Sequence, residues 1–240
     1  MSTYVISDIH GNYEAYMRLL EKIRFSESDT LYVLGDILDR GPEPIRIVLD
    51  LMARPNVICI AGNHELMAMD CLQFLTKEVT EENIRVFDKE RIEKLLTWQM
   101  NGSEPTIDAF SKLSAQTQRA VLDFLSDFEL FDEVFTDDAE YILVHAGLGN
   151  FRPDKELWDY HIDELVWERP DYNVPYFPDR PDRFVITGHT PTMAIPGNPR
   201  PGYIFRNCGH IAIDCGAGFG GRLACICLET QEEFYEECGE

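Results

Sequence analysis

The first sixty residues alternate short apolar runs with segments in which apolar residues recur at helical spacing. The runs at 4–6, 31–34 and 57–60 are typical of buried strands. Between them, apolar side chains recur every three or four positions at 16–23 and 45–52, which predicts two amphipathic helices. This alternation predicts an α/β fold with a largely parallel sheet, in which ligands bind where the strands end.

The pattern changes after residue 65. From about 66 to 131 it is helical and polar, with a break near Gly102, Ser103 and Pro105, and we expect a helical insertion over or beside the sheet. Further strands are predicted at 132–136, 141–144, 184–187, 203–206, 211–214 and 223–228. Turn residues between the last three predict a second, antiparallel sheet.

Two features of the second half complete the outline. A helix is expected to end near Val166, and a Pro- and Tyr-rich loop follows at 169–182. The 240 residues contain no Gly/Ser-rich or Pro-rich linker, so we expect a single domain over 1–240 that carries the insertion at about 66–131.

The charge balance narrows the classes of partner. The chain has 21 Lys and Arg residues against 43 Asp and Glu residues, a formal net charge of −22. Such a surface repels polyanions, so we expect no nucleic-acid and no membrane partner. No stretch is long and apolar enough to span a bilayer. An anionic substrate would need local help from metal ions or clustered Arg side chains.

The seven cysteines are odd in number and form no C-x-x-C pair. We interpret all of them as reduced thiols, and we expect the protein to be cytoplasmic.

Five predicted strands end in the same way, on polar donors flanked by glycine. The segments are "DIHG", "GDILDRG", "GNHE", "HAG" and "GHT", and they carry Asp8, His10, Asp36, Asp39, Arg40, Asn63, His64, His145 and His189. Each residue alone has an ordinary explanation, such as a helix cap, a turn or a hydrogen-bonded histidine. Independent turns would not choose Asp, His and Asn so consistently, and the recurrence therefore predicts a metal site.

The donor types indicate which metals are suitable. Asp8 and His10 are two residues apart, and in extended backbone their side chains would leave on the same side. Carboxylate, imidazole and amide donors suit manganese, iron or zinc, and the absence of thiolates argues against a structural zinc site. A shared carboxylate would hold two ions about 3.5–4 Å apart, and Asp36 is the candidate.

Taken together, the five segments resemble the signature of the calcineurin-like metallophosphoesterases. More narrowly, they resemble the phosphoprotein phosphatases, which are metal-dependent Ser/Thr phosphatases, and their bacterial members. The tail "IDCGAGFGGRLACICL" is similar to the closing strands of that family. The resemblance implies a four-layer β-sandwich of mixed sheets flanked by helices.

The resemblance also implies roles for the site residues. Two divalent ions, manganese first and iron or zinc as alternatives, would be held by Asp8, His10, Asp36, Asn63, His145 and His189. Asp36 would belong to both ions, and a bridging water would attack phosphorus. His64 would protonate the leaving group, with Asp39 orienting its ring. Arg40 and Arg169 would bind phosphate oxygens, although Arg169 could instead be a surface residue at a helix end.

Three functions follow from these residues. The first is a Ser/Thr protein phosphatase-like phosphomonoesterase that acts on phosphorylated proteins or small phosphoesters. The second is a symmetrical dinucleoside tetraphosphatase. From the resemblance, that branch usually carries Asp where Glu65 stands and tends to lack the acid found as Asp39, so we rank it lower. The third is a non-catalytic scaffold. We disfavour it because every expected metal-ligand position is filled.

A group of aromatic residues lies in and before the Pro-rich loop. These residues would form either one wall of a substrate cleft or ordinary core packing: Trp158, Trp167, Tyr172, Tyr176 and Phe177.

Overall fold

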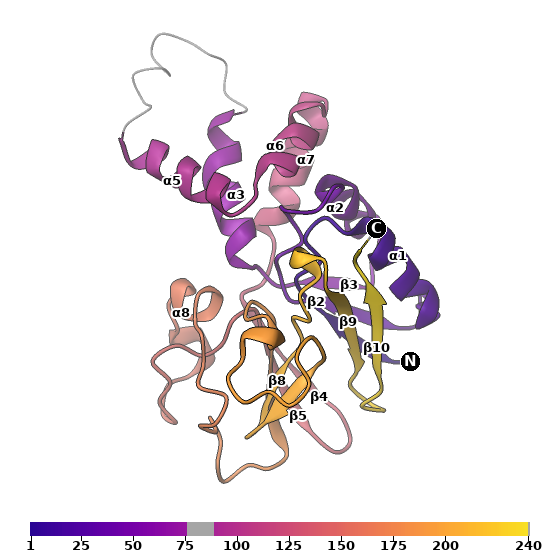
Figure 1. Ribbon diagram of the computed structural model, residues 1–240, viewed down its shortest axis with the longest axis vertical. Coiled ribbons are helices and arrows are strands. Elements are labelled where there is room, and N and C mark those ends of the chain that lie inside the picture. Colours follow the sequence, from indigo (N-terminus) through magenta and orange to yellow (C-terminus); the bar gives the residue numbers. More distant parts are fainter. Residues whose placement is uncertain (76–88, 240) are drawn as a thin grey trace.

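Two five-stranded sheets form the centre of the computed structural model, which describes residues 1–75 and 89–239 (Figure 1). The first sheet has the order β10-β9-β1-β2-β3, with β1 (Thr3–Ile6), β2 (Thr30–Val33), β3 (Val57–Cys59), β9 (Arg222–Cys227) and β10 (Glu233–Glu237). The second has the order β4-β5-β6-β8-β7, with β4 (Phe131–Phe135), β5 (Glu140–Val144), β6 (Arg183–Thr187), β7 (Phe205–Asn207) and β8 (His210–Ala212).

Parallel strands dominate the middle of both sheets. β1, β2 and β3 are parallel neighbours, connected by α1 (Tyr13–Lys22) and by α2 (Pro44–Met52). In the second sheet β5, β6 and β8 are parallel neighbours, and β4 forms an antiparallel hairpin with β5. The carboxyl ends of parallel strands lie at one edge of a sheet, so the loops after these strands are brought close together.

The prediction that the last three strands share one antiparallel sheet is wrong. β7 and β8 do pair antiparallel, but β9 pairs with β1 and with β10 in the first sheet. The apolar segment at 223–227 suits this place because it is buried on both faces: Cys225 lies in one core cluster and Ile226 in another. A single sequence does not reveal which strand such a run will accept as its partner.

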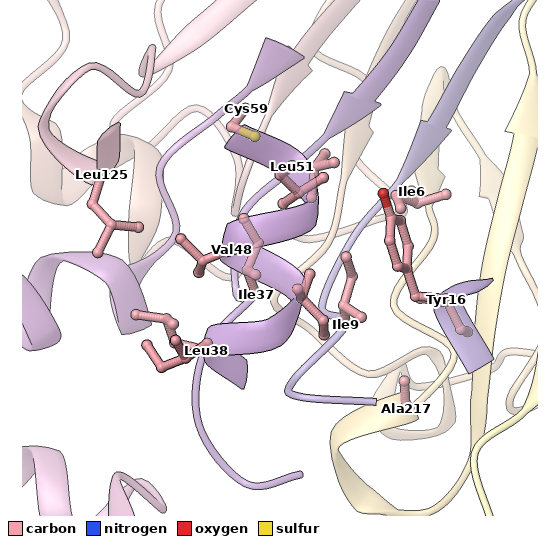
Figure 2. Close-up of a cluster of buried hydrophobic side chains, with 14 of the residues drawn as sticks. Ile6, Ile9, Tyr16, Ile37, Leu38, Val48, Leu51, Cys59, Leu125 and Ala217 are labelled. Atoms are coloured by element: carbon pink, nitrogen blue, oxygen red, sulfur yellow. The ribbon is translucent and has the colours of Figure 1, made fainter. Parts of the chain in front are cut away.

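Apolar side chains separate the layers. Val5, Tyr32, Leu143 and Ile186 belong to a buried cluster that draws residues from both sheets. A second cluster lies between the first sheet and helices α1 and α2 (Figure 2), and a third covers the outer face of the second sheet around α8 (Ile162–Val166). The result is the expected α/β fold, a four-layer sandwich of mixed sheets flanked by helices.

The helices expected after residue 65 pack on one another and on α2. They are α3 (Asn63–Leu75), α5 (Lys89–Met100), α6 (Glu104–Ser111) and α7 (Ala115–Ser126), seen together in the upper part of Figure 1. Residues 76–88 of the expected insertion lie outside the described residues. Trp98 and Phe110 reach from this group into the core cluster beneath α2.

Short turns and one helix complete the chain. α8 ends at Val166 as predicted, and three 3-10 turns are present in the described residues: η1 (Leu157–Asp159), η2 (Thr192–Ala194) and η3 (Ala217–Phe219). No helix within residues 1–75 and 89–239 combines the length and the apolar character that crossing a membrane would require.

Candidate active site

Polar and apolar residues alternate in the two loops that follow β1 and β2. Ile9 separates Asp8 from His10, and Ile37 and Leu38 separate Asp36 from Asp39. The side chains of Ile9, Ile37 and Leu38 are fully buried in the cluster around α2 (Figure 2). Because these apolar residues anchor each loop in the core, the polar residues between them are turned together at the edge of the sheet.

The backbone of these loops is left-handed rather than extended. Six of the ten non-glycine residues with positive φ in the described chain belong to the predicted site, namely Asp8, His10, Asp36, Asp39, Arg40 and His189. Each such residue costs about 1–2 kcal/mol. Our expectation that Asp8 and His10 meet through strand alternation is therefore wrong. They meet through a tight turn, with His10 Nε2 4.0 Å from Asp8 Oδ1.

Asp36 lies at the centre of the six predicted metal ligands. Its Oδ2 atom is 3.6 Å from Nε2 of His10, and its Oδ1 atom is 3.4 Å from Nε2 of His145. Oδ1 of Asn63 lies 3.0 Å from Nε2 of His145 and 2.9 Å from Nδ1 of His189. The His189 backbone N–H in turn donates to both carboxylate oxygens of Asp8. Five separate loops thus bring their polar side chains into one buried cluster.

His64 lies inside the same cluster. Its Nε2 atom is 3.8 Å from Oδ2 of Asp36, close enough for His64 to share a cation with Asp36 and His10. Its Nδ1 atom lies 2.6 Å from Oδ2 of Asp39, and the Arg40 guanidinium lies 3.1 Å from Nε2. Proximity alone allows His64 to be a ligand or a proton donor, and the metal content of a His64 variant separates the two roles.

Burial dominates the electrostatics of the cluster. It raises the pKa values of the Asp8 and Asp36 carboxyls well above their usual range, with further increases from the charge of Asp214 on Asp8 and of Asp8 on Asp36. It lowers the pKa of His145 to about 3 and that of His189 to about 2, so both imidazoles are neutral at pH 7.

These properties fit divalent cations. Metal binding requires unprotonated imidazoles, and crowded buried carboxylates need positive charge nearby. Nε2 of His189 is buried and has no hydrogen-bond partner among the described residues. Two groups of three side chains, His10, Asp36 and His64 on one side and Asp36, His145 and His189 on the other, each place ligand atoms close enough to share an ion, and Asp36 is common to both.

Asp39 is held by residues from the helical segment. The indole N–H of Trp98 donates to Oδ2 at 2.8 Å, and the Thr106 hydroxyl donates to Oδ1 at 2.6 Å. Sequence reasoning missed both residues, because neither carries a local signal and each lies about sixty positions or more from Asp39. The helices α5 and α6 therefore help to position the Asp39–His64 pair.

Glu65 holds the loops together through hydrogen bonds, a role that sequence reasoning missed. Its buried carboxylate accepts backbone N–H groups from Asp36, Ile37, Leu38 and Gly62 at 2.8–3.2 Å. These bonds tie the loop after β2 to the loop after β3. Glu65 therefore acts on the backbone that carries Asp36 and Asn63.

The two predicted arginines contact different residues of the cluster. Nη1 of Arg40 is 2.8 Å from Nε2 of His10, whereas the exposed Arg169 reaches Oγ1 of Thr190, the neighbour of His189, at 3.4 Å. Burial raises the pKa of the Asp214 carboxyl to about 6. The positive charges of both guanidinium groups oppose this increase. Arg169 is thus at the rim of the site, on the side of His189.

Asp214 marks a sixth strand end that sequence reasoning overlooked. It follows β8 in the segment "IAIDCG", and its Oδ1 atom accepts the N–H of Gly216. The signal was present, because an apolar strand again ends on an acid followed closely by glycine.

The aromatic residues near the Pro-rich loop mostly pack in the core. Tyr172 is buried, and Tyr176 and Phe177 pack against the outer face of the second sheet. Of the five aromatic residues singled out from the sequence, all within the described chain, only Trp167 has a ring contact with a site residue, its ring centroid lying 6.1 Å from that of His189.

Comparison with known proteins gives consistent results. The family model described as calcineurin-like phosphoesterase matches residues 1–193. A symmetrical bis(5'-nucleosyl)-tetraphosphatase of Erwinia tasmaniensis is 28% identical over 98% of this chain and 97% of its own length. A protein of the same name from Delftia acidovorans is 37% identical, over 41% of this chain and 36% of its own length.

Comparison with solved structures finds a similar fold. The crystal structure of a candidate diadenosine tetraphosphatase matches with a TM-score of 0.66 and 17% identity, over 100% of this chain and 94% of that one. At this identity the likeness concerns the fold alone.

Proposed function

The chain belongs to the calcineurin-like phosphoesterases, a family of metal-dependent hydrolases, and we propose that it is a symmetrical dinucleoside tetraphosphatase. In this reaction water cleaves the central phosphoanhydride of the tetraphosphate and yields two nucleoside diphosphates. The observation that carries the proposal is that the Erwinia relative, aligned along almost the whole of both chains, bears this name. The buried cluster of Asp, His and Asn side chains supports hydrolysis at phosphorus.

Our expectation of a Ser/Thr protein phosphatase is wrong, because the curated relatives are dinucleoside tetraphosphatases. That expectation counted Glu65 and Asp39 as evidence against the tetraphosphatase branch. In the structure both carboxylates are engaged within the protein. Glu65 is 1% exposed and Asp39 is fully buried, and their oxygens are occupied by backbone N–H groups, His64, Trp98 and Thr106. We therefore infer that neither carboxylate selects the substrate.

The proposed metal ligands are the six residues of the buried cluster. Asp8, His10 and Asp36 would hold one divalent ion, and Asp36, Asn63, His145 and His189 would hold the other. When bound, the ions would supply an activated water and neutralise the charge of the phosphates. The donor set suits manganese, iron or zinc.

The remaining side chains act on the phosphates. Arg40 and Arg169 would bind non-bridging phosphate oxygens, since a guanidinium matches two phosphate oxygens in one plane. As the water oxygen bonds to one of the two inner phosphorus atoms, the bond from that phosphorus to the central bridging oxygen breaks. The leaving nucleoside diphosphate keeps the bridging oxygen, and His64 supplies a proton to that oxygen. Asp39 keeps the ring of His64 in place.

The net charge of −22 gives these cationic groups a further role. A tetraphosphate approaching such a surface is repelled except where the arginines and the bound cations reverse the local field. We therefore place the polyphosphate chain across the cluster, between Arg40 and Arg169.

A comparison of two substrates tests the proposal. The manganese-loaded protein is assayed with diadenosine tetraphosphate and with a phosphoserine peptide, and kcat/KM is measured for each. An Asp36→Asn preparation serves as the blank for contaminating phosphatases. We expect the dinucleotide to be the better substrate. A higher kcat/KM for the phosphopeptide would overturn the proposal.

A further inference from the structure

Two large aromatic side chains are exposed at the edge of the cluster, although neither is needed to hold metals or phosphates. Phe219 is 63% exposed and Trp167 is 42% exposed. Each contacts a different residue of the site: Phe219 lies against Arg40, and Trp167 against His189. An exposed aromatic ring beside a functional site offers a face on which a ligand can stack.

The position of Phe219 is fixed by its neighbours in η3. Ala217 is buried in the core cluster around α2 (Figure 2). Gly218 lies so close to the site that a Cβ atom there would be 2.3 Å from Cδ2 of His10 and 2.9 Å from Nη1 of Arg40. The Arg40 guanidinium covers one face of the Phe219 ring at 4.5 Å. Because the side chain is nonetheless mostly exposed, its other face is open to solvent.

Trp167 lies beside a different residue of the cluster, His189. It follows α8 directly, and its ring is nearly perpendicular to that of His189, at an interplanar angle of 88°. Arg169, two residues further on, reaches the residue after His189.

Contacts through the cluster connect these groups. His10, which Arg40 touches, meets one oxygen of Asp36, and His145 meets the other. Asn63 then joins His145 to His189. The backbone of His189 also donates to Asp8, which lies beside His10, so these contacts form a closed cluster. Phe219 adjoins this cluster at Arg40, and Trp167 adjoins it at His189.

We propose that Phe219 and Trp167 are stacking platforms for the two nucleobases of the substrate, one on each side of the bond that is cleaved. This inference rests on the proposed function. A centrally cleaved dinucleotide carries a base at each end of its polyphosphate, so a matched site needs an aromatic surface at each end. Stacking uses the π-face that every base has, and neutral bases avoid the repulsion of the acidic surface. Purines, with the larger rings, should bind better than pyrimidines.

Single alanine variants test the platforms. Base–aromatic stacking changes affinity by about 5- to 150-fold when the ring is removed. We expect Phe219→Ala and Trp167→Ala each to raise KM for diadenosine tetraphosphate within that range, and Phe219→Trp to keep it near the wild-type value. The matched control is Phe135→Ala. Phe135 is likewise an exposed aromatic residue, at 69%. It pairs with Glu140 at the start of β5, whereas His145 follows the other end of that strand.

Inhibition by products separates this inference from the proposed function. With p-nitrophenyl phosphate as the reporter substrate, the inhibition constant is measured for adenosine diphosphate and for pyrophosphate, which lacks a base. We expect the alanine variants to weaken inhibition by adenosine diphosphate and to leave inhibition by pyrophosphate unchanged. Adenosine diphosphate should also quench the fluorescence of Trp167, and Trp167→Phe should remove that quenching.

The outcomes are distinct. Cleavage of diadenosine tetraphosphate with unchanged KM in both alanine variants overturns the platforms and leaves the proposed function standing. Weakened binding of adenosine diphosphate in a protein that does not cleave the dinucleotide supports the platforms and overturns the function. Equal weakening for adenosine diphosphate and pyrophosphate contradicts stacking, because the loss would then lie in the phosphate contacts.

Discussion

Nδ1 of His64 lies 2.6 Å from Oδ2 of Asp39, and both side chains are buried. The acid is held in turn by Trp98 and Thr106, which come from the helical segment after α3. The imidazole therefore has one fixed orientation, in which Nε2 is directed toward Asp36 and Arg40. The helices α5 and α6 therefore help to orient His64 in the candidate active site, because they hold the Asp39 carboxylate that binds it.

Asp39→Asn should lower kcat by about 10²- to 10⁴-fold, because an amide can donate to Nδ1 and favour the wrong tautomer of His64. KM should change little, since Asp39 does not touch the substrate. Steady-state kinetics with diadenosine tetraphosphate check this. A loss confined to KM would show that Asp39 acts on substrate binding instead.

His64→Asn distinguishes a proton donor from a metal ligand. A proton donor matters most when the leaving group is a poor one, so activity should fall further with an alkyl phosphate than with p-nitrophenyl phosphate. Manganese content, measured by inductively coupled plasma mass spectrometry, should stay at the wild-type value. If the variant loses manganese and both substrates suffer equally, His64 is a ligand.

Asp36→Asn should affect both proposed ions, because the two oxygens of Asp36 face His10 and His145 separately. We expect metal affinity to fall by at least about 100-fold, the upper range seen for less direct partners of a metal. Isothermal titration with manganese checks this, with Phe135→Ala as the control. Two tight sites in the variant would show that Asp36 is not shared.

Glu65→Gln should destabilise the fold by about 1–3 kcal/mol, because a carboxylate that accepts four backbone N–H groups is replaced by an amide with one acceptor oxygen. Urea unfolding of the metal-free protein measures the change. The ratio of activity on diadenosine tetraphosphate to activity on a phosphopeptide should not change, since Glu65 does not contact substrate. A reversed ratio would restore Glu65 as a selector.

His210 gives the fold a dependence on pH that is separate from the metal cluster. It donates Nε2–H to the carbonyl of Val174, packs against Tyr172 and Tyr176, and has no partner for Nδ1 within the described residues. Burial lowers its pKa below 6.5, against smaller upward effects of Val174 and Asp171. Its contribution to stability is thus complete above pH 6.5 and is lost as the pH falls through the lowered pKa.

Replacing this histidine should flatten that dependence. Between pH 7.5 and 5.0, His210→Gln should lose less stability than the wild type, although at pH 7.5 it should be weaker by about 0.5–1.5 kcal/mol. Urea unfolding at both pH values, in the presence of a chelator, measures the difference. Identical slopes for the two proteins would contradict a buried neutral His210.

Much of the site could be predicted because most of its residues belong to a pattern that is visible within a short stretch of sequence. Each apolar strand is followed within a few residues by Asp, His or Asn, and parallel strands deliver their ends to one edge. The convergence of Asp8, Asp36, Asn63, His145 and His189 followed from that rule. The left-handed turns did not, because neighbouring anchors such as Ile9 and Ile37 become visible only when their burial is known.

The remaining errors come from contacts between distant parts of the chain. The pairing of β9 with β1 joins residues more than two hundred positions apart, and Trp98 in α5 contacts Asp39 in the loop after β2. The substrate class was misjudged for a similar reason. Glu65 and Asp39 look like markers in the sequence, but in the structure their carboxylates bind backbone N–H groups and His64.

Hydrolysis of diadenosine tetraphosphate in water enriched in oxygen-18 tests the central claim most directly. After complete turnover by the manganese-loaded protein, the products are separated by anion exchange and analysed by mass spectrometry. Symmetrical cleavage predicts adenosine diphosphate as the product, with one labelled oxygen for every two molecules. Formation of adenosine monophosphate together with adenosine triphosphate, or no turnover by a protein that cleaves p-nitrophenyl phosphate, would contradict it.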